Sequence, residues 1–150
     1  MKKMNNKGFS LVELIVVIAI MGVLMVVLAP QYLRYVEKSR LQKDNSAIAE
    51  VAENIKIALA EQNVYEKVSS GTTVTIQASG ITTSAPTELT DELKNTIGSL
   101  ADVKLTSNAY KSGGNVVLTI TQNSSTNGTF VVTGTGLILS VGGSATSTTF

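Results

Sequence analysis

The residues that could do chemistry in this chain are few, and most of them are carboxylates. The sequence contains no cysteine and no histidine, which excludes thiol nucleophiles, imidazole bases, disulfides and nearly all zinc sites. Glu88, Asp91 and Glu92 form a small acidic cluster that could be read as a metal or acid–base site. They also lie where a short helix is expected to begin, and acidic residues are favoured there without any catalytic role. We therefore expect no catalytic residues, no bound metal and no cofactor.

One carboxylate occupies a position where a charge is costly. Glu13 lies inside the apolar run FSLVELIVVIAIMGVLMVVLA, residues 9–29. As a helix, this run of roughly twenty-one residues is about 31 Å long, which matches the hydrocarbon core of a bilayer. A charge at the centre of that bilayer costs about 2.5–3.5 kcal/mol. Lys2, Lys3 and Lys7 precede the run, and they predict that the N-terminus stays in the cytoplasm while the rest of the chain is exported.

Two ordinary explanations of the apolar run leave something unexplained. A secretory signal peptide needs a small-residue cleavage site, and residues 27–29 fit one loosely. Pro30 would then be the first mature residue, which is a poor arrangement for signal peptidase. A plain single-pass membrane anchor accounts for the length and for the lysines. It accounts neither for Glu13 nor for the sequence KGF at residues 7–9.

The segment KGFSLVELIVVIAIMG, residues 7–22, closely resembles the signal of type IV prepilins, in which a short basic leader ends in glycine and is cut before a phenylalanine. The resemblance implies that residues 1–8 are a leader, that a membrane-embedded prepilin peptidase cleaves between Gly8 and Phe9, and that Phe9 is then N-methylated. It also implies that Glu13 is the family's glutamate, five residues into the mature chain. The matching residues are Lys7, Gly8, Phe9, Ser10, Leu11, Glu13 and Leu14.

The physical chemistry of Phe9 and Glu13 agrees with this resemblance. After cleavage Phe9 carries a free α-ammonium group, and Glu13 lies one helical turn further along. A carboxylate buried in a core of like helices is tolerated only if it is paired and hydrogen-bonded. The partner that we expect is the α-amino group of Phe9 in a neighbouring subunit. Such a pair fixes the axial register of assembly more than it adds stability.

A single helix is expected from Phe9 to Asn63, about 80 Å long. Its second half carries an apolar stripe with spacings of three, four and seven residues, formed by Leu41, Ile48, Val51, Ala52, Ile55, Ala58 and Leu59. A remainder of about ninety residues has a radius of gyration near 12 Å and cannot cover such a helix. Residues 9–30 are therefore expected to be the transmembrane and filament-core helix. Residues 31–150 are expected to be the exported domain, with 31–63 as the amphipathic half of the helix.

Two residues are expected to weaken this helix. Pro30 removes a backbone hydrogen bond, and Gly22 is a second weak point. We expect a kinked but continuous helix in the isolated subunit, with a flexible segment between these residues. Tyr32 and Tyr35, which flank Arg34 just beyond the apolar run, are typical of anchors at the membrane interface. They could equally pack between subunits.

Beyond residue 71 the hydrophobic period changes to two, which predicts strands at residues 72–78, 102–107, 115–122 and 129–141. A short amphipathic helix is predicted to begin after Pro86, with Thr87 or Thr90 as its cap. The resemblance implies the same architecture, an α+β type IV pilin fold. In that fold the long N-terminal helix packs on a four-stranded antiparallel sheet with a short intervening helix.

Asn127 and Gly128 are the strongest signal for a two-residue hairpin turn. Such a turn places Val116, Leu118 and Ile120 on one face with Leu139, Leu137 and Thr135, and leaves Phe130 on the face towards solvent. Asn123 and Asn127 each begin a triplet of the N-glycosylation type. Because such triplets are common by chance in loops rich in Asn, Ser and Thr, the turn is the favoured interpretation. The composition of the last nine residues, GGSATSTTF, favours fraying.

The resemblance implies a structural subunit, most simply a major one, of a type IV pilus used for adhesion, motility or aggregation. Its implied partners are other copies of itself, minor pilins, prepilin peptidase, and the pilus assembly platform protein with its ATPase. Before assembly it would lie in the cytoplasmic membrane, and afterwards in a filament on the cell surface. No basic patch for nucleic acid remains beyond the N-terminal lysines. The alternatives are a pseudopilin of a type II secretion or competence system and a membrane-tethered binding domain that never polymerises.

Overall fold

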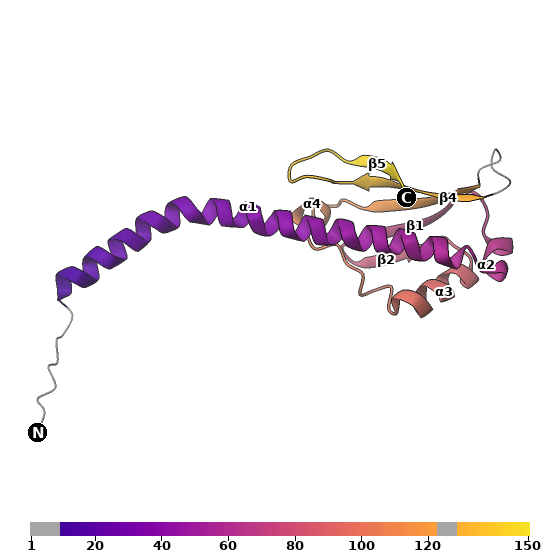
Figure 1. Ribbon diagram of the computed structural model, residues 1–150, viewed down its shortest axis with the longest axis horizontal. Coiled ribbons are helices and arrows are strands. Elements are labelled where there is room, and N and C mark those ends of the chain that lie inside the picture. Colours follow the sequence, from indigo (N-terminus) through magenta and orange to yellow (C-terminus); the bar gives the residue numbers. More distant parts are fainter. Residues whose placement is uncertain (1–9, 123–128) are drawn as a thin grey trace, which may run out of the picture. The chain divides into compact units, whose positions relative to one another are not determined.

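The computed structural model describes residues 10–122 and 129–150. The predicted cleavage pair, Gly8 and Phe9, lies outside the described residues, as do Asn123 and Asn127, which begin the two triplets for which glycosylation was the disfavoured interpretation. The chain divides into two compact units, Met1–Val36 and Glu37–Phe150. Helix α1 (Leu11–Ala58) begins in the first unit and ends in the second, and the other labelled elements belong to the second unit (Figure 1).

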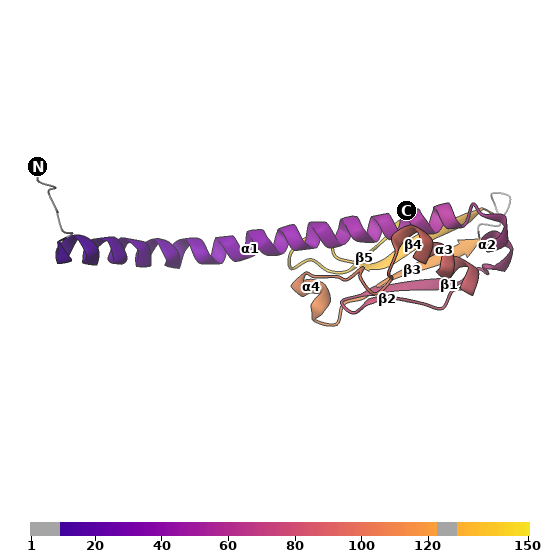
Figure 2. The same cartoon turned by 90° about the horizontal axis from the view of Figure 1, so that it is seen from below.

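Within the second unit, α1 lies along one face of the sheet (Figure 2). Its buried residues are Leu41, Asp44, Ile48, Val51, Ala52, Ile55 and Ala58. They recur at spacings of three and four, which confirms the predicted stripe and places it on the core side of the helix. The core consists of this stripe, the inward side chains of the strands and the apolar side of the short helix α3 (Thr87–Ile97).

The predicted end of the long helix at Asn63 is wrong. Helix α1 ends at Ala58, and a short helix α2 (Gln62–Lys67) follows it. The amide of Glu61 bonds the carbonyl of Ala58, three residues back, at 3.1 Å, which tightens the last turn and ends the α-helical pattern. The break redirects the chain so that Val64 reaches the core, where it is 4% exposed.

The sheet has five antiparallel strands in the order β2-β1-β3-β4-β5. They are β1 (Thr72–Gln77), β2 (Gly80–Thr83), β3 (Val116–Gln122), β4 (Phe130–Leu137) and β5 (Thr146–Thr149). The predicted α+β class, with a long helix on an antiparallel sheet and a short intervening helix, is confirmed. The predicted number of four strands is wrong, because β2 and β5 are additional strands and residues 102–107 are not a strand.

Residues 102–107 have a physical reason not to join the sheet. Strand β1 is already paired on both edges, with β2 and with β3. The amides of Thr106 and Ser107 donate instead to the carboxylate of Asp44 on α1. Leu105 is buried in the core, at 1% exposure, and this burial accounts for the alternating pattern in the sequence.

The predicted hairpin register between β3 and β4 is also wrong. A two-residue turn at Asn127-Gly128 would place Ile120 opposite Thr135, whereas Ile120 pairs with Val132. The register thus differs by three residues, and an odd shift exchanges the two faces of a regular strand. Phe130 accordingly packs on the core rather than facing solvent, with its ring centroid 5.1 Å from that of Tyr65. Leu137 is nevertheless buried, as predicted, beyond an irregularity in β4 between Thr135 and Leu137.

The predicted short helix is confirmed as α3, but its predicted cap is not. Pro86 occupies the cap position, and no side chain caps the first turn. The hydroxyl of Thr90 donates to the carbonyl of Pro86 at 3.1 Å, one turn back within the helix. Leu89 and Leu93, both 0% exposed, anchor the helix in the core. A four-residue helix α4 (Asn108–Lys111) precedes β3.

Candidate functional site

The first unit presents an apolar helix surface to its surroundings on every side. The fifteen large hydrophobic side chains from Leu11 to Leu28 are between 47% and 76% exposed. Among the described residues, α1 is long and apolar enough to cross a membrane, judged by length and composition. A helix that is apolar all round belongs inside a bilayer or inside a bundle of other helices. This segment of α1 is therefore the candidate site.

Glu13 lies at the start of this helix and already accepts one hydrogen bond. Its Oε2 accepts the backbone amide of Ser10 at 2.9 Å, while the carbonyl of Ser10 accepts the amide of Leu14 at 3.2 Å. The residues 10–13, SLVE, thus form one half of a capping box, in which the acid at the third helical position satisfies an otherwise unpaired amide. The signature S-x-x-E was available in the sequence, and it gives Glu13 a local role besides the predicted assembly role.

The two predicted weak points, Gly22 and Pro30, both lie inside the continuous helix α1. A Cβ added at Gly22 would meet nothing within 4 Å, so nothing within the described chain requires glycine there. Pro30 has no amide hydrogen to donate to the preceding turn. Tyr32 and Tyr35 follow on the same helix at 66% and 72% exposure. The apolar segment therefore ends in two exposed aromatic side chains.

Two carboxylates on α1 anchor the loop before α4, and neither was predicted to do so. Asp44 is 1% exposed and accepts the amide of Thr106 at 2.9 Å, the hydroxyl of Thr106 at 3.0 Å and the amide of Ser107 at 2.8 Å. One oxygen of Glu37 accepts the amide of Asn108. These bonds satisfy backbone amides that no strand partner receives. The signal in the sequence was that Glu37 and Asp44 fall on the apolar stripe, at positions that should be hydrophobic.

Tyr110 ties the end of β4 to α1. Its hydroxyl donates to Asn45 Oδ1 at 3.2 Å and accepts the amide of Ile138 at 2.9 Å. The side-chain amide of Asn45 donates to the carbonyl of Ile138 at 3.0 Å. Burial raises the pKa of the Tyr110 phenol above its usual value, an effect that the Ile138 hydrogen bond opposes and the nearby Asp44 charge reinforces.

The acidic cluster on α3 is an ordinary solvated helix surface. Asp91 pairs with Lys94 at 3.0 Å, with both side chains more than half exposed, and the side-chain amide of Asn95 donates to Glu92 at 3.4 Å. Within residues 10–122 and 129–150, no group of three or more Asp or Glu side chains is placed to hold a metal ion.

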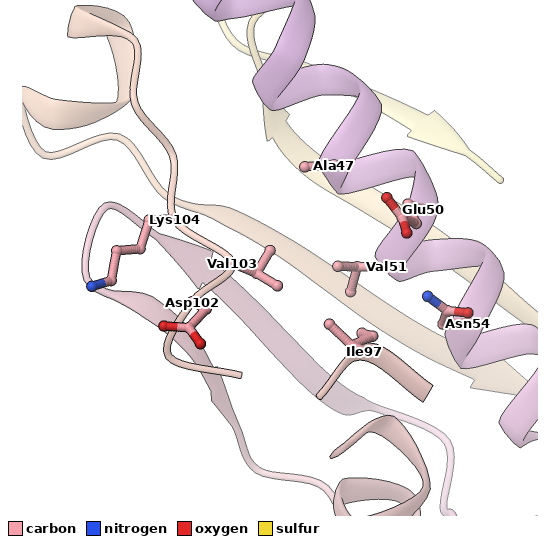
Figure 3. A pocket seen from close by; sticks show the side chains of 8 residues that line it. All are labelled: Ala47, Glu50, Val51, Asn54, Ile97, Asp102, Val103 and Lys104. Carbon is pink, nitrogen blue, oxygen red and sulfur yellow. The ribbon is translucent and has the colours of Figure 1, made fainter. Parts of the chain in front are cut away.

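A cavity of about 260 Å³ lies between α1 and residues 97–104. Figure 3 shows Val51, Ile97 and Val103 pointing toward one another, while the charged ends of Asp102 and Lys104 point away from them. The remaining lining residues are Ala47, Glu50 and Asn54. The polar side chains do not converge on a common point, so this cavity lacks the arrangement that acid–base chemistry needs.

Comparison with known proteins gives one family match and several relatives that match part of the chain. Residues 3–29 match the family described as the prokaryotic N-terminal methylation motif. A 59-residue stretch is 34% identical to a type IV major fimbrial protein FimA of Dichelobacter nodosus, covering 39% of this chain and 38% of that protein. A 67-residue stretch is 33% identical to prepilin peptidase-dependent protein A of Clostridium perfringens, covering 44% of this chain and 48% of that protein. No solved structure matches the chain.

These matches confirm the predicted resemblance to type IV prepilins. The FimA relatives are, by their names, fimbrial proteins. The chain spans less than half the length of the relatives that it matches. The family match covers residues 3–29, and the role of the second unit is left to be inferred.

Proposed function

We propose that this chain is a structural subunit of a type IV pilus. In this proposal residues 1–8 are a leader that prepilin peptidase removes between Gly8 and Phe9, and Phe9 becomes the N-methylated first residue. Residues 9–30 anchor the subunit in the membrane and later form the filament core, and residues 31–150 form the exported domain. The observation that carries the proposal is the apolar segment of α1, exposed on all sides and interrupted by a single acid, Glu13.

The mechanism follows from what surrounds the apolar helix before and after assembly. Lipid tails are as apolar as a bundle of helices, so moving the helix from one to the other gains little hydrophobic energy. Extraction from the membrane must therefore be driven, and the ATPase of the assembly platform is the partner that supplies the work. Packing between helices then retains the subunit. Glu13 pairs with the α-amino group of Phe9 in a neighbouring copy and sets the axial register.

Residues within and just after the apolar segment are compatible with both the membrane and the filament. In the membrane, Tyr32 and Tyr35 lie where aromatic side chains favour the interface. Gly22 and Pro30 give the helix a segment that can stretch or bend once it leaves the bilayer. Before assembly the subunit spans the cytoplasmic membrane with its N-terminus inside, and after assembly it lies in a surface filament. Minor pilins are further proposed partners.

The first test is the mature N-terminus, read by mass spectrometry of the purified protein. We expect a chain that begins at Phe9 and carries one additional methyl group on its amino terminus. A chain that begins after Ala29, or that keeps Met1, would contradict the proposal. A chain that begins at Phe9 and is unmethylated would support cleavage and contradict only the methylation.

The second test separates a filament subunit from a membrane-tethered domain. Glu13→Ala should leave the protein in the membrane and remove it from sheared surface fibres, because the register-setting acid is lost. Glu53→Ala is the matched control, since Glu53 is an exposed acid on the same helix that pairs only weakly with Lys56. If Glu13→Ala enters fibres as well as Glu53→Ala does, Glu13 does not set the register.

The name of the Clostridium perfringens relative refers to prepilin peptidase and not to a fimbria, which keeps a pseudopilin as the second candidate. A pseudopilin of a type II secretion or DNA-uptake system would share the cleaved N-terminus and the response to Glu13→Ala. Electron microscopy of cells labelled for this chain distinguishes the two. Long labelled surface fibres support a pilus, and label confined to the cell envelope supports a pseudopilin.

A further inference from the structure

A groove at the start of the second unit contains a half-buried acid, Glu37, one of whose carboxylate oxygens has no hydrogen-bond partner among the described residues. The groove has a volume of about 510 Å³ and is lined on its apolar side by Leu41, Ala109, Ile138 and Val141. Glu37 lines it as well, with a side chain that is only 14% exposed. A ligand-sized groove with an apolar wall and one acid suits an apolar segment that carries a single cation.

The two oxygens of Glu37 differ in their partners. Oε1 accepts the amide of Asn108. Oε2 is buried and has no hydrogen-bond partner among the residues that the structure describes. The Arg40 guanidinium is 4.0 Å from Oε2, beyond hydrogen-bond range, on a side chain that is 49% exposed. A buried carboxylate oxygen left in this state is costly, so the groove is incomplete without a donor.

We propose that the groove receives α1 of a neighbouring copy of this chain, whose Arg34 donates to Glu37 Oε2 while its Leu33 covers the apolar wall. Both residues are available on the surface of the isolated chain. Leu33 is 66% exposed, and Arg34 is also exposed. Together they offer the combination that the groove lacks, a cation next to a large apolar side chain. This inference rests on the proposed function, because it requires a filament.

The expected register of the filament selects the same two residues. Subunits of a helical filament are related by one repeated operation, so the axial offset between two neighbours is the same at every level. If Glu13 of one copy meets Phe9 of the next, the offset is four residues, about 6 Å at 1.5 Å per residue. Where residues 33–37 advance along the filament by the same amount as residues 9–13, this offset brings residue 33 of the neighbour to the level of Glu37. Lys38 of the neighbour would be more than one turn too far.

Disulfide cross-linking tests this contact directly, because the chain has no cysteine of its own. Two differently tagged chains are expressed in the same cells, one with Leu33→Cys, which keeps Arg34, and the other with Val141→Cys, and sheared fibres are oxidised. We expect a disulfide-linked heterodimer that carries both tags. Lys38→Cys with Val141→Cys is the matched control. It should give little heterodimer, because a disulfide forms only when the two Cα atoms are about 4.4–6.8 Å apart. Residue 38 of the neighbour lies more than one helical turn from the level of the groove, which is too far for this range.

Each result of this experiment bears on the inference. A heterodimer that depends on position 33 supports it, and a contact within one chain cannot produce both tags in one band. Fibres in normal amount with no heterodimer overturn this inference and leave the proposed function intact. Equal cross-linking from positions 33 and 38 overturns the assigned register. If the unmodified protein forms no fibres, the proposed function fails and the inference fails with it.

Charge removal gives an independent measurement without new cysteines. Arg34→Gln should reduce the amount of protein in sheared fibres about tenfold, because a buried charge-assisted hydrogen bond is lost. Arg40→Gln, the same change six residues along the helix, should stay within about twofold of the unmodified protein. The opposite pattern would show that Glu37 is completed by Arg40 within its own subunit, and would overturn the inference.

Discussion

Replacing Asp44 with alanine should destabilise the second unit by about 3–5 kcal/mol. The carboxylate accepts three donors, the amide and hydroxyl of Thr106 and the amide of Ser107. A buried donor that loses its partner costs about 1–3 kcal/mol. Thr106 is partly exposed and can bond water after the change, whereas Ser107 is 0% exposed and cannot. The total therefore lies in the lower part of the range of about 3–9 kcal/mol that three full penalties would give.

The assay is urea unfolding of the mature full-length protein in detergent, followed by near-ultraviolet circular dichroism of the tyrosines. Asp44→Asn should fall between the alanine variant and the unmodified protein, because the amide retains one oxygen acceptor. Asp91→Ala is the control, since Asp91 is 58% exposed and pairs only with Lys94. Its free energy of unfolding should change by less than about 0.5 kcal/mol. If Asp44→Ala and Asp91→Ala cost the same, the loop does not depend on this carboxylate.

Three further changes test other parts of the second unit by the same assay. Because burial raises the pKa of Tyr110 above 10.0 in the folded protein, the folded state keeps the proton longer than the unfolded chain. Stability should therefore be intact below about pH 10 and fall as the pH rises above it, and Tyr110→Phe should make that fall shallower. Gly136→Ala should cost about 2–4 kcal/mol, because φ is +85° and a Cβ would lie 2.3 Å from the carbonyl oxygen of Asn115. Gly142→Ala, with φ +77° and open space around the new Cβ, should cost only about 1 kcal/mol, and equal costs would contradict the assigned clash. Phe150→Ala should speed hydrogen exchange in β5 while leaving β1 unchanged, and unchanged exchange in β5 would show that the ring does not hold this strand.

The features that could be predicted from the sequence are those that depend on local spacing. The apolar run, the acid inside it and the stripe from Leu41 to Ala58 are patterns of residue type that repeat within one or two helical turns, so they can be recognised in the sequence alone. The short helix α3 was found for the same reason. In the candidate site, the apolar character of α1 and the position of Glu13 needed nothing beyond the linear pattern.

The errors come from pairings between residues far apart in the chain. The register of β3 and β4 depends on which residues of β4 fill the core. The observed register places the buried Val132 opposite Ile120, whereas the predicted two-residue turn at Asn127-Gly128 would have placed Thr135 there. Residues 102–107 look like a strand because Leu105 is buried, but the amides of Thr106 and Ser107 donate to Asp44 on α1 rather than to a strand. Both outcomes depend on partners that are distant in the chain, which local propensity does not contain.

The carboxylates of Glu37 and Asp44 show a second limit on what can be predicted from the sequence. Glu37 and Asp44 interrupt the apolar stripe at its own spacing, so the sequence marks them as unusual. It does not say what they meet, because their partners are backbone amides more than sixty residues away. A backbone amide has the same chemistry in every residue, so no residue type identifies it in advance.

The same reasoning explains how the C-terminal segment is held without a disulfide. Fraying of the last nine residues was the prediction, yet β5 pairs along β4 and the amide of Phe150 bonds the carbonyl of Val132 at 3.0 Å. The ring of Phe150 packs on the core. It lies over Gly134, where a Cβ would come within 2.6 Å of it. The pairing of β5 with β4 and the packing of Phe150 thus hold the C-terminal segment in place of a disulfide. This arrangement requires glycine at position 134, where the ring crosses β4. In the proposed role as a filament subunit, such a tie has the advantage that it forms without any oxidising step.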